Sequence, residues 1–302
     1  MFAKSIGLLS LAALAQARVI TRQDCNKTAN AAAAANVVFD GRIAANTTQA
    51  DFDTENGPYG SEFVKGQNVS FSELVFLPAV EPSMFDQQVG AKPFEVTVDD
   101  RSIFAPGGSN PQVAVRRTEL SPRDALVPNN ATTTGIKTLH FSIRPSEERP
   151  LNVSHEYNLV FLERADFSNN IFMLRTGTLL GSNGTTKNDL VLVGNTGEGT
   201  KTLFTTPFTA GEWTNLAFQM DFNANTIQVF ASTGNEALSQ QTEPLANDML
   251  GNGQLHFGVN KNPTNPGQDL LREGFQPSGI HEGVVYGGVW VEDTANSTVT
   301  LS

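Results

Sequence analysis

Apolar and polar side chains alternate in short runs along most of this chain, a pattern typical of β-strands with one buried face. Glycine, proline and asparagine separate the runs, and helical periodicity is scarce. Short strands with turn signals between them predict an all-β fold, a β-jelly roll or two-sheet antiparallel sandwich with a concave substrate cleft. The clearest strands are expected at 94–98, 112–120, 136–144, 157–162, 171–175, 189–193, 214–221, 226–231, 254–259 and 283–292.

Three smaller elements are also expected. The asparagine-rich centre of residues 220–227 favours a hairpin turn. Short helical turns are predicted near 71–75 and 245–250.

Alternation also gathers polar side chains on one face of several strands. In the run 135–145, Leu139, Phe141 and Ile143 make a core side, and His140 points the other way. In the run 253–261, His256 and Asn260 share a polar face. In the run 155–163, alternation places Glu156 and Asn158 on one face and separates them from Glu163. Such a set suits a lined cleft, and the alternative is a solvated outer face of the sheet.

The run QVAVRRTEL at 112–120 carries the most informative charges. Arg117 and Glu119 lie two residues apart, so a strand presents both on the same side. Such a pair is costly to bury and useful in a cleft, where a cation tunes the pKa of a carboxylate. The alternative is a surface ion pair on an edge strand.

The N-terminus predicts secretion. Residues 1–17 have the basic start, short apolar stretch and Ala-Gln-Ala end of a signal peptide. No later window holds 18 uninterrupted apolar residues, so we expect a soluble extracellular protein with no membrane partner. Residues 18–35 are expected to be an N-terminal lead-in, and residues 36–302, without repeat or linker, are expected to form a single domain.

The composition of the chain limits the classes of partner and ligand that it can bind. The formal net charge of −11 and the pI near 4.8 argue against nucleic acid and leave neutral polymers open. The lone Cys25 cannot form an internal disulfide, and no metal-ligand spacing or cofactor motif is visible. Seven N-x-S/T sequons are candidate glycan sites, at Asn26, Asn46, Asn68, Asn130, Asn152, Asn183 and Asn296.

Seven segments in order resemble glycoside hydrolase family 131, a group of secreted fungal β-glucanases. The resemblance runs from about Val37 to Asp293, and it implies a β-jelly roll that hydrolyses β-1,3, β-1,6 and β-1,4 linkages of glucans. The segments are NVVFDGRI (36–43), FVKGQNVSFSELVFLP (63–78), QVAVRRTEL (112–120), GIKTLHFSI (135–143), RPLNVSHEYNLVFLE (149–163), LHFGVNK (255–261) and GFQPSGIHEGVVYGG (274–288).

The resemblance also implies two catalytic glutamates assisted by a histidine. The first maps to Glu119, and the second to Glu156 or Glu163, of which alternation favours Glu156. The histidine maps to His256, with His140 as the other candidate. The resemblance implies inversion, and our hypothesis is that Glu156 is the acid and Glu119 the base.

Substrate binding is expected from further polar and aromatic residues. We assign it to Arg117, His140, Asn158 and Tyr286, whereas Trp213 and Trp290 are expected to pack in the core. The expected partner of this monomer is a β-glucan polysaccharide or oligosaccharide.

Two other functions compete with this interpretation. A jelly-roll polysaccharide lyase would use Arg117, His140 and Tyr286 for β-elimination. A non-catalytic, lectin-like protein would bind glucan without releasing reducing sugar.

Overall fold

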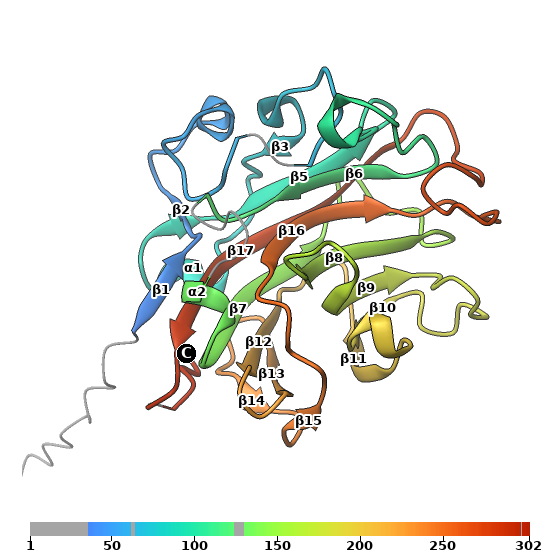
Figure 1. Cartoon of the computed structure of the whole chain (residues 1–302). Coiled ribbons are helices and arrows are strands. Elements are labelled where there is room, and N and C mark those ends of the chain that lie inside the picture. The colour runs from blue at the N-terminus through green and yellow to red at the C-terminus, as the bar shows by residue number, and fades with distance from the viewer. Residues whose placement is uncertain (1–35, 62–63, 124–129, 297) are drawn as a thin grey trace, which may run out of the picture. The chain divides into compact units, whose positions relative to one another are not determined.

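Two antiparallel β-sheets make up the body of the molecule (Figure 1). The computed structural model describes residues 36–61, 64–123, 130–296 and 298–302. Within these ranges, sheet I has nine strands and contains β7 and β17 at its centre. Its members are β1 (Val37–Asp40), β3 (Val75–Phe76), β5 (Phe94–Asp99), β7 (Ile136–Pro145), β12 (Thr214–Asp221), β13 (Thr226–Thr233), β14 (Ser239–Gln240), β15 (Leu245–Ala246) and β17 (His281–Asp293).

Sheet II has six strands in the described part of the chain, in the order β11-β10-β9-β8-β16-β6. They are β6 (Arg116–Leu120), β8 (Glu156–Glu163), β9 (Asn170–Gly177), β10 (Asp189–Val193), β11 (Thr202–Pro207) and β16 (Gln254–Lys261). A two-stranded sheet pairs β2 (Ile43–Ala44) with β4 (Ala91–Lys92). Helices are short: α1 (Met84–Gln87), α2 (Asn130–Thr133) and 3₁₀ turns at Gln49–Asp53, Phe71–Glu73, Pro106–Gly108 and Thr196–Glu198.

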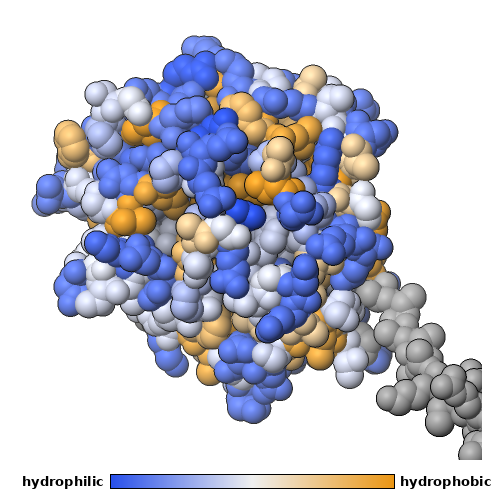
Figure 2. Space-filling view, turned by 180° about the vertical axis from the view of Figure 1, so that it is seen from behind, coloured by the Kyte–Doolittle hydropathy of each residue, from blue (hydrophilic) through white to orange (hydrophobic). Residues whose placement is uncertain are grey.

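The main core lies between the inner faces of the two sheets. Phe218 of sheet I packs edge-on against Phe141 of the same sheet and against Phe172 of sheet II, with ring centroids 5.4 and 5.6 Å apart. All three rings are buried. The outer faces of the two sheets do not contribute to this core. Seen from behind, the surface of the molecule is mostly hydrophilic, with small hydrophobic patches (Figure 2).

The predicted all-β sandwich is confirmed, and each predicted strand forms. The strand predicted at 112–120 begins only at Arg116. The hairpin at 220–227 also forms, with Asn225 in the left-handed region at φ 54°. A 3₁₀ turn occupies Phe71–Glu73 as expected, but the turn predicted at 245–250 is wrong, because Leu245–Ala246 pairs with β13.

Several further strands were not predicted from the sequence. The longest is β11, Thr202–Pro207, which is largely exposed and threonine-rich, so its alternation is weak. The predicted signal peptide, lead-in, Cys25 and the Asn26 sequon lie outside the described residues. Across the described ranges, no helix has the length and apolar character needed to span a membrane.

A β-bulge in β8 determines which side chains leave the core. The register between β8 and β9 shifts between Asn158 and Val160, so β8 has one extra residue there. Leu159 and Val160 consequently both face the core, and Phe161 faces outward. The prediction that alternation separates Glu156 from Glu163 is therefore wrong, because both line the same outer cleft.

Candidate active site

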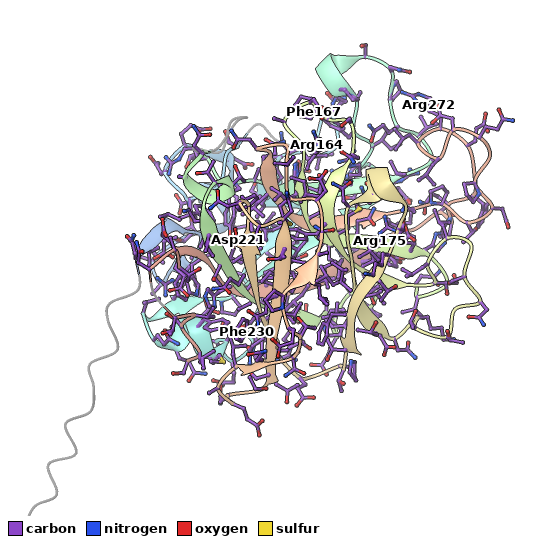
Figure 3. All side chains as sticks on the ribbon, turned by 60° about the horizontal axis from the view of Figure 1, so that its bottom comes forward. Arg164, Phe167, Arg175, Asp221, Phe230 and Arg272 are labelled. Atoms are coloured by element: carbon purple, nitrogen blue, oxygen red, sulfur yellow. The ribbon has the colours of Figure 1, made fainter. Side chains whose placement is uncertain are left out.

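A cleft of about 430 Å³ lies on the outer face of sheet II. Its lining comes from four strands of that sheet and from the loops that rise beside them. The residues that line it are Arg117, Glu156, Asn158, Phe161, Glu163, Asn170, Met173, Arg175, Leu180, Thr196, Thr200, Asn260, Asn262, Leu270 and Leu271. Arg175, which Figure 3 labels, projects from β9.

Glu119 lies beneath this cleft with its carboxylate fully buried. Arg117 donates from Nε to Oε1 at 2.8 Å and from Nη2 to Oε2 at 3.0 Å, which makes a bidentate ion pair. Burial by itself raises the pKa of Glu119, but the charge of Arg117 and the contact with His256 outweigh it and lower the pKa to about 2. Glu119 is therefore ionised throughout the ordinary pH range. The predicted pairing of Arg117 with Glu119 on one face is confirmed.

His256 lies between two carboxylates. Its Nδ1 is 3.2 Å from Oε2 of Glu119, and its Nε2 is 3.4 Å from Oε2 of Glu163. The imidazole stacks on Phe161, with centroids 4.4 Å apart and planes within 8°. Burial lowers the pKa of His256, but the contacts with the two glutamates outweigh burial and raise it above the usual value. The buried Nε2 has no hydrogen-bond partner in good geometry, so its contact with Glu163 is a loose ion pair.

Glu163 is the carboxylate of this group that reaches the cleft. Its side chain is 23% exposed, whereas that of Glu119 is 0% exposed. Each ring nitrogen of His256 faces one of the two carboxylates, so the imidazole occupies the space between Glu119 and Glu163.

Glu156 lies further along the cleft and does not join Glu119. The register places Glu119 opposite Gly258, while Asn262, four residues further on, donates its N–H to the Glu156 carbonyl. Four strand residues span about 13 Å, and the two glutamates also lie on strands that flank β16 on opposite sides. The predicted direct pairing of Glu119 with Glu156 is therefore wrong.

Two asparagine amides and one arginine in the cleft each have a polar atom without a hydrogen bond. Asn158 and Asn260 are directly opposite each other on β8 and β16, and the Oδ1 atom of each is buried without a hydrogen bond. The Nε atom of Arg175 is likewise buried and unpaired. Buried polar atoms are costly unless water or a ligand satisfies them, and sugar hydroxyl groups complement such a mixed set of donors and acceptors.

Residues 37–297 match the glycoside hydrolase 131 catalytic N-terminal domain. The chain belongs to glycoside hydrolase family 131. It is therefore a glycoside hydrolase. Most enzymes of this class use a pair of carboxylates.

Two solved structures share the fold of this family 131 hydrolase. The first is the catalytic domain of a GH131 β-glucanase from Podospora anserina, 23% identical, with a TM-score of 0.69; the match covers 88% of this chain and 98% of that one. The second is the catalytic domain of a family 131 protein from Coprinopsis cinerea, 23% identical, with a TM-score of 0.65 and coverage of 88% and 97%. No curated protein matches the chain.

Two residues that were expected in the cleft of the hydrolase lie elsewhere. Tyr286 is buried between the sheets, where its hydroxyl contacts the carbonyls of Leu159 and Gly258 at 3.1 and 2.6 Å. His140 is buried on the outer side of sheet I, against Trp290 and Phe85. The prediction that Tyr286 and His140 bind substrate in the cleft is therefore wrong.

Other predictions from the sequence have mixed outcomes. Trp213 and Trp290 are buried, as expected. Sequence reasoning missed Arg175 as a cleft residue, although its place at the end of an otherwise apolar run was a visible signal. Among the residues that the structure describes, no group of three or more acidic, His or Cys side chains is placed to hold a metal. Six sequon asparagines are exposed, at Asn46, Asn68, Asn130, Asn152, Asn183 and Asn296.

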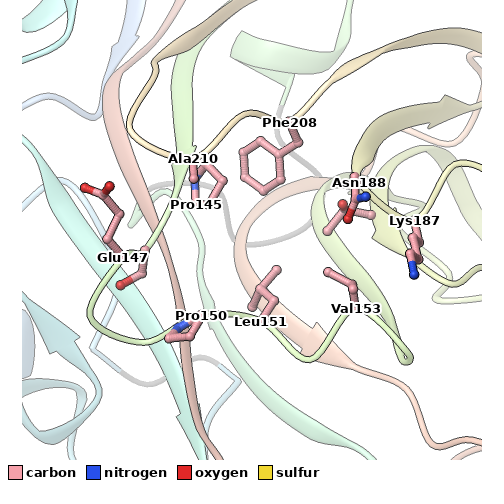
Figure 4. Close-up of a pocket in the computed structure, with 11 residues that line it drawn as sticks. Pro145, Glu147, Pro150, Leu151, Val153, Lys187, Asn188, Phe208 and Ala210 are labelled. Atoms are coloured by element: carbon pink, nitrogen blue, oxygen red, sulfur yellow. The ribbon is translucent and has the colours of Figure 1, made fainter.

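A second hollow of about 380 Å³ opens at the flank of the sandwich (Figure 4). Phe208, Leu151 and Val153 are directed into it, and Glu147 and Lys187 are its ionisable residues. It has one carboxylate and no histidine. The flank hollow therefore lacks the two acid–base groups that glycoside hydrolysis needs, in contrast to the cleft.

Proposed function

We propose that this protein hydrolyses β-glucans in the cleft of sheet II, with Glu119, His256 and Glu163 as its acid–base groups. The observation that carries the proposal is the array of two carboxylates joined by one imidazole at the edge of the cleft. Membership of family 131 supports the same reaction class. The β-1,3, β-1,6 and β-1,4 linkages are the candidates, as the sequence resemblance implied.

A neutral polysaccharide suits the lining of the cleft. Arg117 and Arg175 are balanced by Glu156 and Glu163, so the lining carries no excess of either charge. The unpaired amide of Asn158 and its neighbours offers hydrogen bonds to sugar hydroxyl groups. Apolar side chains of the lining provide surface for the faces of sugar rings.

In this mechanism Glu163 donates a proton to the leaving glycosidic oxygen, because it is the carboxylate of the array that faces the cleft. Water adds to the anomeric carbon from the face opposite Glu163, and the proton that it loses leaves through the solvent of the open cleft. His256 returns a proton from Nε2 to Glu163, and its imidazolium is stabilised between the two carboxylates, which favours its reprotonation. Glu119 stays ionised and balances the charge of the imidazolium, and we expect the anomeric centre to be inverted, as the sequence resemblance implies.

The lyase alternative loses support from the positions of its residues. It requires Arg117, His140 and Tyr286 to meet at one substrate, but His140 and Tyr286 lie outside the cleft, on and inside sheet I. A lectin-like protein would still bind glucan through the cleft. We also propose that the protein acts outside the cell as a monomer, as the N-terminal sequence and the substrate suggest.

Product analysis tests the proposal. Laminarin, β-1,6-glucan and cellulose are incubated with the wild type and with Glu163→Gln, and released reducing ends are measured together with their initial anomeric configuration by NMR. We expect the wild type to release α-configured reducing ends and the variant to release almost none. Unsaturated products would establish a lyase, and binding without release by the wild type would establish a lectin.

A further inference from the structure

Glu156 and Leu180, here called the wall, lie where the cleft adjoins a second space. Glu156 and Leu180 line the cleft on one side and a second space of about 310 Å³, here called the outer hollow, on the other. The outer hollow is further lined by Ser154, His155, Thr178, Leu179, Gly181, Ser182, Pro263, Thr264, Asn265 and Pro266. The cleft and the outer hollow therefore adjoin each other at these two residues.

Hydrogen bonds hold the wall in place. Leu180 donates its backbone N–H to Oε2 of Glu156 at 2.9 Å, and Asn262 donates from Nδ2 to Oε1 at 2.7 Å. Arg175 adds a cation, with Nη1 3.8 Å from Oε2. Glu156 is only 3% exposed and both of its oxygens accept hydrogen bonds, so its carboxylate holds the loop and the end of β16 together.

The loop that carries Leu180 is fixed at its base. Thr178 donates its N–H to the carbonyls of Val153 and His155, at 2.9 and 3.0 Å, and its hydroxyl to Val153 at 2.8 Å. Gly177 has φ 79°, and a Cβ there would lie 2.0 Å from the His155 carbonyl oxygen, so only glycine allows this close approach. The backbone therefore sets the position of the wall, and the Leu180 side chain gives it bulk.

We infer that Glu156 and Leu180 are a chain stop that sets the length of the oligosaccharide held between the wall and Glu163. The inference rests on the proposed function of the cleft. Glu163 and Glu156 are at opposite ends of β8, about 20 Å apart along the strand, so the space between them holds a few sugar units. A glucan chain in the cleft ends at the wall instead of running on into the outer hollow.

Leu180→Ala tests the stop without endangering the fold, because Leu180 is 38% exposed. We expect the wild type to release a narrow range of short oligosaccharides and Leu180→Ala to release longer ones, with the ratio of long to short products raised several-fold. Leu250→Ala is the matched control, since Leu250 is also an exposed leucine and lines neither the cleft nor the outer hollow. Product lengths of the control should match those of the wild type.

A binding series keeps the inference separate from hydrolysis. Affinities of β-glucan oligosaccharides of increasing length are measured by calorimetry with Glu163→Gln and with the double variant Glu163→Gln, Leu180→Ala. The affinity should stop rising at a short length in the first protein and at a greater length in the second. Identical plateaus in both proteins, or product lengths that Leu180→Ala leaves unchanged, would overturn the chain stop. An inactive wild type that still shows the shifted plateau would refute hydrolysis and support the stop.

Discussion

The outer faces of the two sheets carry similar clusters with different surroundings. On sheet II, His256 stacks on Phe161 with centroids 4.4 Å apart and contacts a buried glutamate. On sheet I, His140 stacks on Trp290 with centroids 4.1 Å apart and bonds to Glu292 at 2.9 Å. Both imidazoles are buried, and both stacks have planes within 8°.

The difference lies in the second carboxylate and in what covers each cluster. His256 has Glu163 as a further neighbour, and Glu163 opens into the cleft. On sheet I, Phe85 of α1 packs edge-on against His140, and Thr300 donates two hydrogen bonds of 2.9 Å to Glu292. A buried histidine–glutamate pair on an aromatic ring is therefore a stabilising contact, and access to a cleft is what makes one a candidate for catalysis.

Removing a carboxylate from each cluster should give the largest contrast. Glu163→Gln removes the proton donor while keeping its shape, so we expect reducing-sugar release to fall by about 10²–10⁴-fold. Glu292→Gln is the matched change on sheet I and should leave the rate close to that of the wild type. Equal losses in the two variants would contradict the assignment of the acid.

Replacing the two histidines should separate rate from stability. His256→Gln removes the imidazole that joins the carboxylates, and we expect kcat to fall by about 10²-fold with KM little changed. His140→Gln should leave kcat unaltered but lower the free energy of unfolding by about 1–3 kcal/mol, because Glu292 loses a buried partner. Urea unfolding and initial rates measure the two quantities, and a large drop in kcat for His140→Gln would refute the comparison.

Two asparagines allow a smaller test of the same contrast. Asn158→Ala removes an amide with an unpaired Oδ1 in the cleft, so we expect KM to rise by about 5- to 10-fold, which corresponds to one hydrogen bond. Asn215 of sheet I already bonds to Ser142, Ser232 and Gly234. Asn215→Ala should lower the free energy of unfolding without changing KM. An unchanged KM for Asn158→Ala would show that the Asn158 amide does not bind substrate.

The pH dependence of stability should have opposite signs for the two histidines. The pKa of His256 is raised in the folded state, so its contribution is complete below the unfolded pKa of about 6.5 and is lost as the pH rises through the folded pKa. Burial outweighs the bond to Glu292 and lowers the pKa of His140, so unfolding takes up a proton and stability falls as the pH drops below about 6.5. Urea unfolding from pH 5 to 8 should show the alkaline loss reduced in His256→Gln and the acid loss reduced in His140→Gln.

Much of the sandwich could be predicted from the sequence, because the alternation of apolar and polar residues indicates which face of a strand is buried. Leu139, Phe141 and Ile143 were assigned to the core and pack there. Arg117 and Glu119 were placed on one face and form a bidentate pair, since they are two positions apart on a regular strand. These predictions succeeded because they depend on local periodicity alone.

The sequence by itself determined the fold class, the family and the pair of Arg117 and Glu119. The tertiary structure decided which residues surround them. One extra residue in β8 places Glu163 on the same face as Glu156 and beside His256. The alternation of apolar and polar residues does not reveal such a bulge, because it assumes a regular strand. The sheet that a strand joins is likewise set by long-range pairing, which is why His140 and His256 look alike in the sequence but lie on different sheets.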